Sequence, residues 1–312
     1  MKIAFGAAGL RTLDYKFSWH SDNPAPDSLT KELLEWVKKT GFDGFEMEDH
    51  WVDFYSFSPN ELKNYKKLVD STGFDIPCLK VPGKNVTDPK CRETNAKKLL
   101  KSIDIADALG ARMISVNLAL DLTSLYGIPQ TELSGRPKSP SGSKDATDED
   151  WERTANALRK TALRGKEIGV DVVIEVHHCS VADGARSTIK LLDLIGEPNV
   201  TANPDLGNIF WLYDIPDEPY DEAIELLAPY AGDWWHCKNP TRIYIPELQR
   251  SVFIGGTLER GEINYRYAIN VMKQAGFDGY ILIEGGGLSD IYRAAQLNLE
   301  YIKSLLKDLE IN

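Results

Sequence analysis

Cysteine is scarce in this chain of 312 residues, and the four cysteines lie far apart. None of Cys78, Cys91, Cys179 and Cys237 belongs to a CxxC pair. Secreted proteins that depend on disulfide frameworks are much denser in cysteine. We therefore expect reduced thiols and a cytoplasmic location.

Long apolar runs and basic clusters are also missing. The apolar start MKIAFGAAGL gives way to LRTLDYKFSWH, which is too short for a signal sequence, and no segment has the length of a membrane span. The formal net charge is −11, with no block of Lys and Arg. A nucleic-acid surface needs clustered basic residues, so we expect neither a nucleic-acid partner nor a membrane partner.

What the sequence does contain is an alternation of short β-rich runs with longer amphipathic segments. Several amphipathic segments end at a glycine before the next run, as in TGFDGFEME, LGARMISVN, IGVDVVIEV and AGFDGYILI. The pattern predicts a (β/α)8 TIM barrel that forms a single domain over residues 1–312. An open doubly wound sheet is less favoured because the first turn, GAAGLRTLD, lacks a glycine-rich phosphate motif. The expected strands are Lys2–Ala7, Phe42–Glu48, Asp75–Val81, Arg112–Leu118, Asp171–Val176, Val200–Asp205, Asp233–Cys237 and Gly279–Glu284.

Two of the segments that follow strands exceed the usual length, at about 119–148 and about 239–261. In a barrel both would lie over the carboxyl-terminal face, where substrates bind. We expect them to be long loops that cover a site, with residues 139–144 the most mobile part.

Four consecutive predicted strands end in a residue that can bind a metal: Glu175, Asp205, His236 and Glu284. A charge that follows a buried apolar run is costly unless it is paired or binds an ion. Neighbouring parallel strands lie about 4.8 Å apart, so these side chains can converge. Three carboxylates and one imidazole favour one divalent ion, Mn²⁺ before Co²⁺ or Mg²⁺.

The segments IEVHH, PDLGN, HCKNPTR, GEINY and ILIEGG carry a resemblance to the xylose-isomerase-like superfamily of sugar phosphate isomerases and epimerases. The resemblance covers nearly the whole chain and extends to the catalytic subunits of C-glycoside deglycosidases. It implies that Glu175, Asp205, His236 and Glu284 bind the metal. It also implies that Glu175 and Glu284 act as the acid–base pair.

Further residues are expected around this centre. His177 lies on the same side of its strand as Glu175, and can act as a base or bind a substrate hydroxyl. Lys238, two residues past His236, can stabilise an oxyanion. The resemblance implies substrate contacts for Glu46 and Arg242. The remaining candidates for substrate binding are Asn208, which replaces a histidine of the free-ketohexose epimerases, and Trp19 and His20 in the loop after the first strand.

The favoured function is a metal-dependent isomerase or epimerase that removes a proton next to the carbonyl of a sugar and forms an enediolate. The first alternative is a lyase that expels a group from the same enolate, as inosose dehydratases and the C-glycoside deglycosidases do. The second alternative is a non-catalytic sugar-binding subunit. Expected partners are a sugar substrate and either further copies of the chain or, as the resemblance to the deglycosidases implies, a small β-sandwich subunit.

Overall fold

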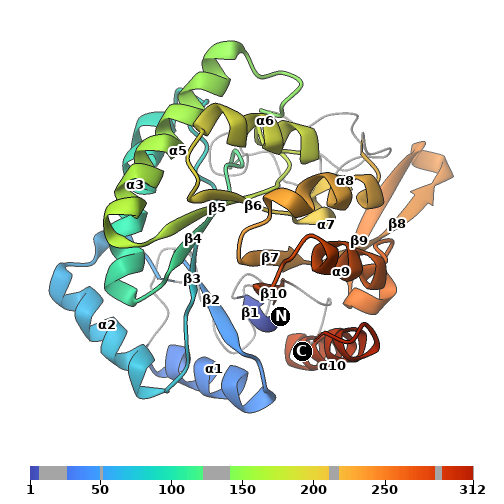
Figure 1. Cartoon of the computed structure of the whole chain (residues 1–312), viewed down its shortest axis with the longest axis horizontal. Coiled ribbons are helices and arrows are strands. Elements are labelled where there is room, and N and C mark those ends of the chain that lie inside the picture. The colour runs from blue at the N-terminus through green and yellow to red at the C-terminus, as the bar shows by residue number, and fades with distance from the viewer. Residues whose placement is uncertain (7–26, 50–51, 122–140, 211–217, 285–289, 312) are drawn as a thin grey trace.

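The computed structural model describes residues 1–6, 27–49, 52–121, 141–210, 218–284 and 290–311. Eight parallel strands form the wall of a nearly closed barrel, which confirms the predicted fold (Figure 1). Each strand lies within the range expected from the sequence. They are β1 Lys2–Gly6, β2 Gly44–Glu48, β3 Cys78–Val81, β4 Met113–Val116, β5 Asp171–Glu175, β6 Val200–Asn203, β7 Trp234–Cys237 and β10 Tyr280–Ile283.

Helices surround the barrel and bury their apolar faces against it. Gly110 and Gly169 end two of them in the left-handed conformation, with φ of 79° and 80°, as the helix–Gly–strand phrases predicted. None of the described helices is both long and apolar enough to cross a bilayer. The helices are α1 Asp27–Thr40, α2 Pro59–Ser71, α3 Arg92–Leu109, α5 Asp148–Ile168, α6 Ala185–Ile195, α7 Leu206–Phe210, α8 Tyr220–Leu227, α9 Tyr265–Gln274 and α10 Ile291–Asp308.

The barrel wall has one weak joint, between β6 and β7. The hydrogen-bonded order runs β6-β5-β4-β3-β2-β1-β10-β7, so the described backbone forms no ladder between the two end strands. An isolated bridge joins Ala202 to Ala231, and the Gly232 amide donates to the Ala202 carbonyl at 3.0 Å. Higher in the joint, the Asn203 side chain accepts a hydrogen bond from the backbone N–H of His236 at 2.7 Å. A side-chain amide therefore substitutes for a ladder bond beside the candidate metal site.

A small apolar cluster packs below that site, separate from the larger core between the barrel and the helices. Its members come from six strands and are almost fully buried: Ala4, Cys78, Met113, Val173, Trp234, Tyr280 and Leu282. Side chains on alternate positions of a strand share one face, so Trp234 and His236 both point inward. This apolar cluster, called the packed floor below, thus lies beneath the candidate metal ligands in the barrel interior.

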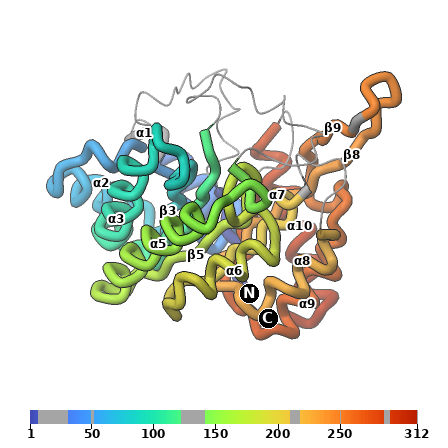
Figure 2. The backbone as a smooth tube through the Cα atoms, turned by 90° about the horizontal axis from the view of Figure 1, so that it is seen from above, coloured from blue at the N-terminus to red at the C-terminus, as the bar shows by residue number. Residues whose placement is uncertain are grey.

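The second long segment is not the simple loop that the sequence suggested. It forms an antiparallel hairpin of β8 Asn239–Ile245 and β9 Arg250–Gly256, which projects from the barrel (Figure 2). The alternating runs RIYI and SVFI explain the pairing, since β-branched and aromatic residues favour strands. Of the first long segment, residues 122–140 lie outside the described part of the chain.

Candidate metal centre and active site

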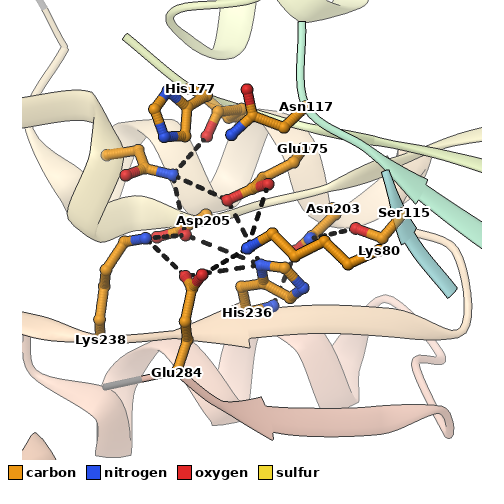
Figure 3. A network of polar contacts seen from close by, with 12 residues as sticks. Lys80, Ser115, Asn117, Glu175, His177, Asn203, Asp205, His236, Lys238 and Glu284 are labelled. Atoms are coloured by element: carbon orange, nitrogen blue, oxygen red, sulfur yellow. Dashed lines mark hydrogen bonds and ion pairs between the residues drawn. The ribbon is translucent and has the colours of Figure 1, made fainter. Parts of the chain in front are cut away.

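The ends of four strands bring the predicted ligands together at the carboxyl-terminal end of the barrel (Figure 3). Glu175 ends β5, Asp205 follows β6, His236 lies on β7 and Glu284 follows β10. One ligand atom from each residue lies within 4.8 Å of those of the others, and all four residues are buried. The structure thus gathers the four residues that the sequence singled out.

A buried carboxylate fixes the orientation of the His236 ring. The ring Nε2 lies 2.8 Å from Glu46 Oε1, which also accepts a hydrogen bond from Trp234 Nε1 at 2.7 Å. The other ring nitrogen, Nδ1, faces Glu175 Oε1 at 3.4 Å and Glu284 Oε2 at 3.6 Å. Glu46 is buried and contacts the ring, and its expected contact with substrate stays a prediction. Such carboxylate–histidine pairs orient metal ligands.

The chemistry of these donors fits a divalent ion. His236 Nδ1, Glu175 Oε2 and Asp205 Oδ1 are buried atoms without a hydrogen-bond partner among the described residues. Buried polar atoms normally have a hydrogen-bond partner, so three atoms without one, on residues that converge, indicate a binding site. Oxygen-rich sites with one imidazole suit Mn²⁺, Mg²⁺ or Co²⁺. The four side chains could therefore hold one metal ion.

Sequence reasoning missed one charged residue of the site, Lys80 on β3. Its ammonium group contacts Glu284 Oε1 and lies 3.6 Å from Glu175 Oε2. Lys80 is 3% exposed, so it reaches the carboxylates from inside the barrel. The signal was present in the sequence, because CLKV places a charge inside an apolar strand, the same criterion that identified the carboxylates.

Lys238 approaches the cluster from the side of β7. Its Nζ lies 2.8 Å from Asp205 Oδ2 and 2.5 Å from Glu284 Oε2. Its side chain keeps 20% of its surface exposed, compared with 4% for Lys80. Of the two ammonium groups beside the carboxylates, Lys238 is therefore the one that a substrate can reach.

These neighbours perturb the ionisation of the ligands. Burial alone would raise the pKa of Glu175, but the Lys80 ammonium and the His236 ring hold it well below its usual range. Burial is likewise overcome at Glu284, where Lys238 and Lys80 lower the pKa. Burial dominates at Asp205 and raises its pKa to about 7 despite the attraction of Lys238. The two glutamates are therefore ionised near neutral pH, while Asp205 holds a proton part of the time.

Asn208 connects two of the ligands. Its side-chain Nδ2 donates to Glu175 Oε1 at 3.1 Å, to Asp205 Oδ2 at 2.9 Å and to the Val176 carbonyl at 3.0 Å. The residue is 2% exposed. The buried amide thus links two carboxylates, and the expected contact of Asn208 with substrate stays a prediction.

His177 lies above Glu175 in Figure 3, close to the ligand cluster. Its Nδ1 lies 2.8 Å from the His178 carbonyl oxygen, which can only accept, so Nδ1 carries the proton. Burial lowers the pKa of His177 to about 4. The ring is therefore neutral near pH 7 and presents Nε2 as an acceptor.

The remaining candidates lie away from the ligands or outside the description. Arg242 is on β8, and its guanidinium pairs with Glu262 at 2.7 Å. Its expected contact with substrate stays a prediction. Trp19 and His20 lie outside the described residues.

The structure defines a class of protein, the TIM barrels, here with four side chains at the carboxyl-terminal end that could hold a metal ion. Within that class, the chain belongs to the xylose isomerase-like TIM barrel family, whose model matches residues 34–305. Among curated proteins it is similar to an inosose dehydratase of Clostridium perfringens, with 23% identity over 284 residues that cover 86% of each chain.

Solved structures agree with this fold. A xylose isomerase-like TIM barrel protein from Mycobacterium smegmatis, crystallised in complex with magnesium, has a TM-score of 0.80 and 21% identity, covering 98% of this chain and 97% of that one. An L-ribulose 3-epimerase has a TM-score of 0.69 and 17% identity, covering 98% and 95% of the two chains. At these identities the likeness supports the fold.

Proposed function

We propose that this protein is a divalent-metal-dependent enzyme that removes a proton next to the carbonyl of a keto-sugar or keto-polyol. The observation that carries the proposal is the convergence of Glu175, Asp205, His236 and Glu284 within 4.8 Å, beside two ammonium groups. A bound divalent ion supplies Lewis-acid polarisation of a substrate oxygen. The curated and structural relatives, which include sugar-modifying enzymes, support this class of substrate.

For the fate of the enediolate we favour elimination of water, with epimerisation second. An epimerase that uses two glutamates needs a second carboxylate free to exchange a proton. Both carboxylate oxygens of Glu284 contact ammonium groups, Oε1 with Lys80 and Oε2 with Lys238. Glu175 Oε2 has no hydrogen bond, and the nearest ammonium, that of Lys80, lies 3.6 Å away. This asymmetry favours one carboxylate base, and the inosose dehydratase relatives point the same way.

In the proposed elimination, different side chains accept a proton, donate a proton and orient the substrate. Glu175 accepts the proton from the carbon next to the carbonyl. The hydroxyl group on the following carbon leaves with a proton from the partly exposed Lys238, so that water is released and a double bond forms. Neutral His177 accepts a hydrogen bond at Nε2 and can orient a substrate hydroxyl. Asn208 and Glu46 hold the ligands in place.

The experiment is a product analysis with Mn²⁺ and four substrate classes: keto-cyclitols, free ketohexoses, ketohexose phosphates, and 3-oxo-glucosides with phenolic aglycones. We expect a keto-cyclitol or keto-sugar product that has lost the mass of one water. A product of unchanged mass would instead establish an isomerase or epimerase, and a released phenol would establish a lyase of 3-oxo-glycosides. If the protein binds the metal but converts none of the four substrate classes, the non-catalytic sugar-binding subunit would be the remaining alternative.

A further inference from the structure

Lys80 joins the two halves of the ligand set from the inside of the barrel. Its strand, β3, lies two positions from β5 and three from β10 in the sheet order. Its ammonium nevertheless contacts Glu284 after β10 and faces Glu175 on β5. The side chain thus crosses the barrel interior and lies between the two glutamates (Figure 3).

In the form that binds a metal, with every carboxylate ionised and the imidazole neutral, the charges around His236 do not balance by themselves. The side chains described above comprise four carboxylates and two ammonium groups, which leave a formal charge of −2 when the imidazole is neutral: Glu46, Glu175, Asp205, Glu284, Lys80 and Lys238. Uncompensated charge in a buried place is costly. One divalent cation makes this set neutral, and without Lys80 the same set would match a trivalent ion.

Lys80 also limits how the glutamates can bind an ion. Glu284 Oε1 is held by Lys80, so this carboxylate turns Oε2 towards His236 Nδ1. At Glu175 the atom nearest Lys80 is Oε2, while Oε1 faces the histidine. Lys80 therefore holds Oε1 of Glu284 and lies beside Oε2 of Glu175, while the other oxygen of each glutamate faces His236.

We propose that Lys80 is a positioning residue that matches the metal site to a single divalent ion, because it neutralises one negative charge, holds Oε1 of Glu284 and lies beside Oε2 of Glu175. The inference rests on the proposed metal-dependent function and deepens it. Lys80 acts through Glu175 and Glu284 and has no contact with substrate in this scheme.

The test compares Mn²⁺ and Tb³⁺ binding to the full-length protein and to Lys80→Met, which removes the charge and keeps an unbranched side chain. Coulomb energy scales with the charge of the ion, so loss of one positive charge nearby strengthens binding of both ions, and of Tb³⁺ more. We expect Mn²⁺ to bind about tenfold more tightly and Tb³⁺ about 30-fold more tightly. The kcat for the elimination should fall about 100-fold, with KM changed little, because the glutamates lose their fixed positions.

Lys84→Met is the matched control. Lys84 is also a buried lysine, 4% exposed, but it pairs with Asp49 at 2.7 Å rather than with the metal ligands. We expect this variant to bind both ions as the unmodified protein does. If Lys80→Met does not fold, Lys80→Gln removes the same charge and must give the same change in ion selectivity.

The outcomes separate this inference from the function beneath it. Weaker binding of both ions by the folded Lys80 variant, or an unchanged ratio of the two affinities, would overturn the role of Lys80 and leave the metal site standing. Failure of the unmodified protein to bind Mn²⁺ would overturn the proposed function and this inference together.

Discussion

Each candidate ligand is held by a polar side chain from another part of the barrel. Glu46 orients His236, Asn208 bridges Glu175 and Asp205, and Glu284 contacts two lysines. A buried polar group that loses its partner costs about 1–3 kcal/mol, and more when it is charged. The ligands are therefore positioned by interactions whose loss can be measured one residue at a time.

The first prediction concerns the two glutamates. Glu175→Gln and Glu284→Gln should each lower kcat by about 100-fold or more, because each change removes a charged ligand and the first also removes the proposed base. Both residues lie at the ends of their strands, above the packed floor, so the fold should persist. Steady-state kinetics and circular dichroism measure the two effects. Near-normal turnover of Glu175→Gln would transfer the role of base to His177.

The second prediction concerns Glu46. Glu46→Gln removes the negative charge that holds the His236 ring, so we expect Mn²⁺ affinity to fall by about 10–100-fold. Isothermal titration calorimetry provides the measurement. Trp234→Phe is the control, because it removes the other hydrogen bond to Glu46 Oε1 and leaves the contact with His236. Unchanged Mn²⁺ binding by Glu46→Gln would show that the ring keeps its orientation without this carboxylate.

The candidate metal ligands could be predicted from the sequence, whereas the residues that contact them largely could not. Glu175 and Glu284 stand out because each follows an apolar run in a predicted strand. The positioning roles of Glu46 and Asn208 depend on which atoms meet across the barrel, and strand periodicity does not determine such contacts. Lys80 shows the same pattern in its strand, but its contacts with Glu175 and Glu284 are made across the barrel interior, where strand periodicity does not determine which side chains meet.

At the scale of elements, the Asn203 side chain bridges the upper part of the joint between β6 and β7. Asn203→Ala would leave the buried backbone N–H of His236 without its acceptor. We expect the free energy of unfolding to fall by about 1–3 kcal/mol. Chemical denaturation measures this loss. Ser115→Ala removes only the 3.4 Å contact to Asn203 Nδ2 and should have a small effect. A similar loss in both variants would assign the effect to packing rather than to the joint.

The β8–β9 hairpin is expected to contribute little to stability. Ile243, Tyr244 and Leu248 are 44%, 53% and 53% exposed, and an isolated two-stranded sheet is weak in water. Replacing residues 242–253 with an Asn-Gly turn between Thr241 and Ile254, which are paired in the hairpin, should shift the unfolding midpoint by less than about 4 °C. Differential scanning calorimetry tests this. A much larger shift would mean that the hairpin is part of the folding core.

Local sequence determined the barrel strands but not the hairpin. The helix–Gly–strand phrases repeat the same chemistry around the ring, so the eight parallel strands could be placed within a few residues. The segment 239–261 follows a strand at the functional face, and its length suggested a loop. Its two strand-like runs are separated by Pro246–Leu248, which forms a turn of 3₁₀ helix. This turn reverses the direction of the chain, and the composition of the two strand-like runs did not predict it.

For the whole molecule, metal binding and protonation should compete. Burial lowers the pKa of His236, but the carboxylates of Glu46 and Glu175 outweigh it and hold this pKa well above its usual value, while Asp205 has a pKa of about 7. A ligand must lose its proton to bind an ion. Below its pKa each of these groups holds a proton that the ion must displace. As the pH is lowered, the apparent Mn²⁺ affinity should therefore fall about tenfold per pH unit for each proton displaced.

Calorimetric titration with Mn²⁺ in buffers of different ionisation enthalpy counts the released protons directly. We expect proton release between about pH 6 and pH 8, with tighter binding at the upper end. Affinity that is independent of pH across this range would contradict the protonated state of His236 and Asp205 in the metal-free protein.

The joint between β6 and β7 also determines where the barrel can fluctuate. A barrel opens at the lowest free-energy cost where the fewest hydrogen bonds join neighbouring strands. Local openings of this kind set the rate at which amide hydrogens exchange with water. Asp205 lies on one side of this joint and His236 on the other. An ion bound by both residues would link the two end strands, and its binding energy would then oppose the opening of the wall. Metal binding and closure of the barrel would then be linked in a single equilibrium.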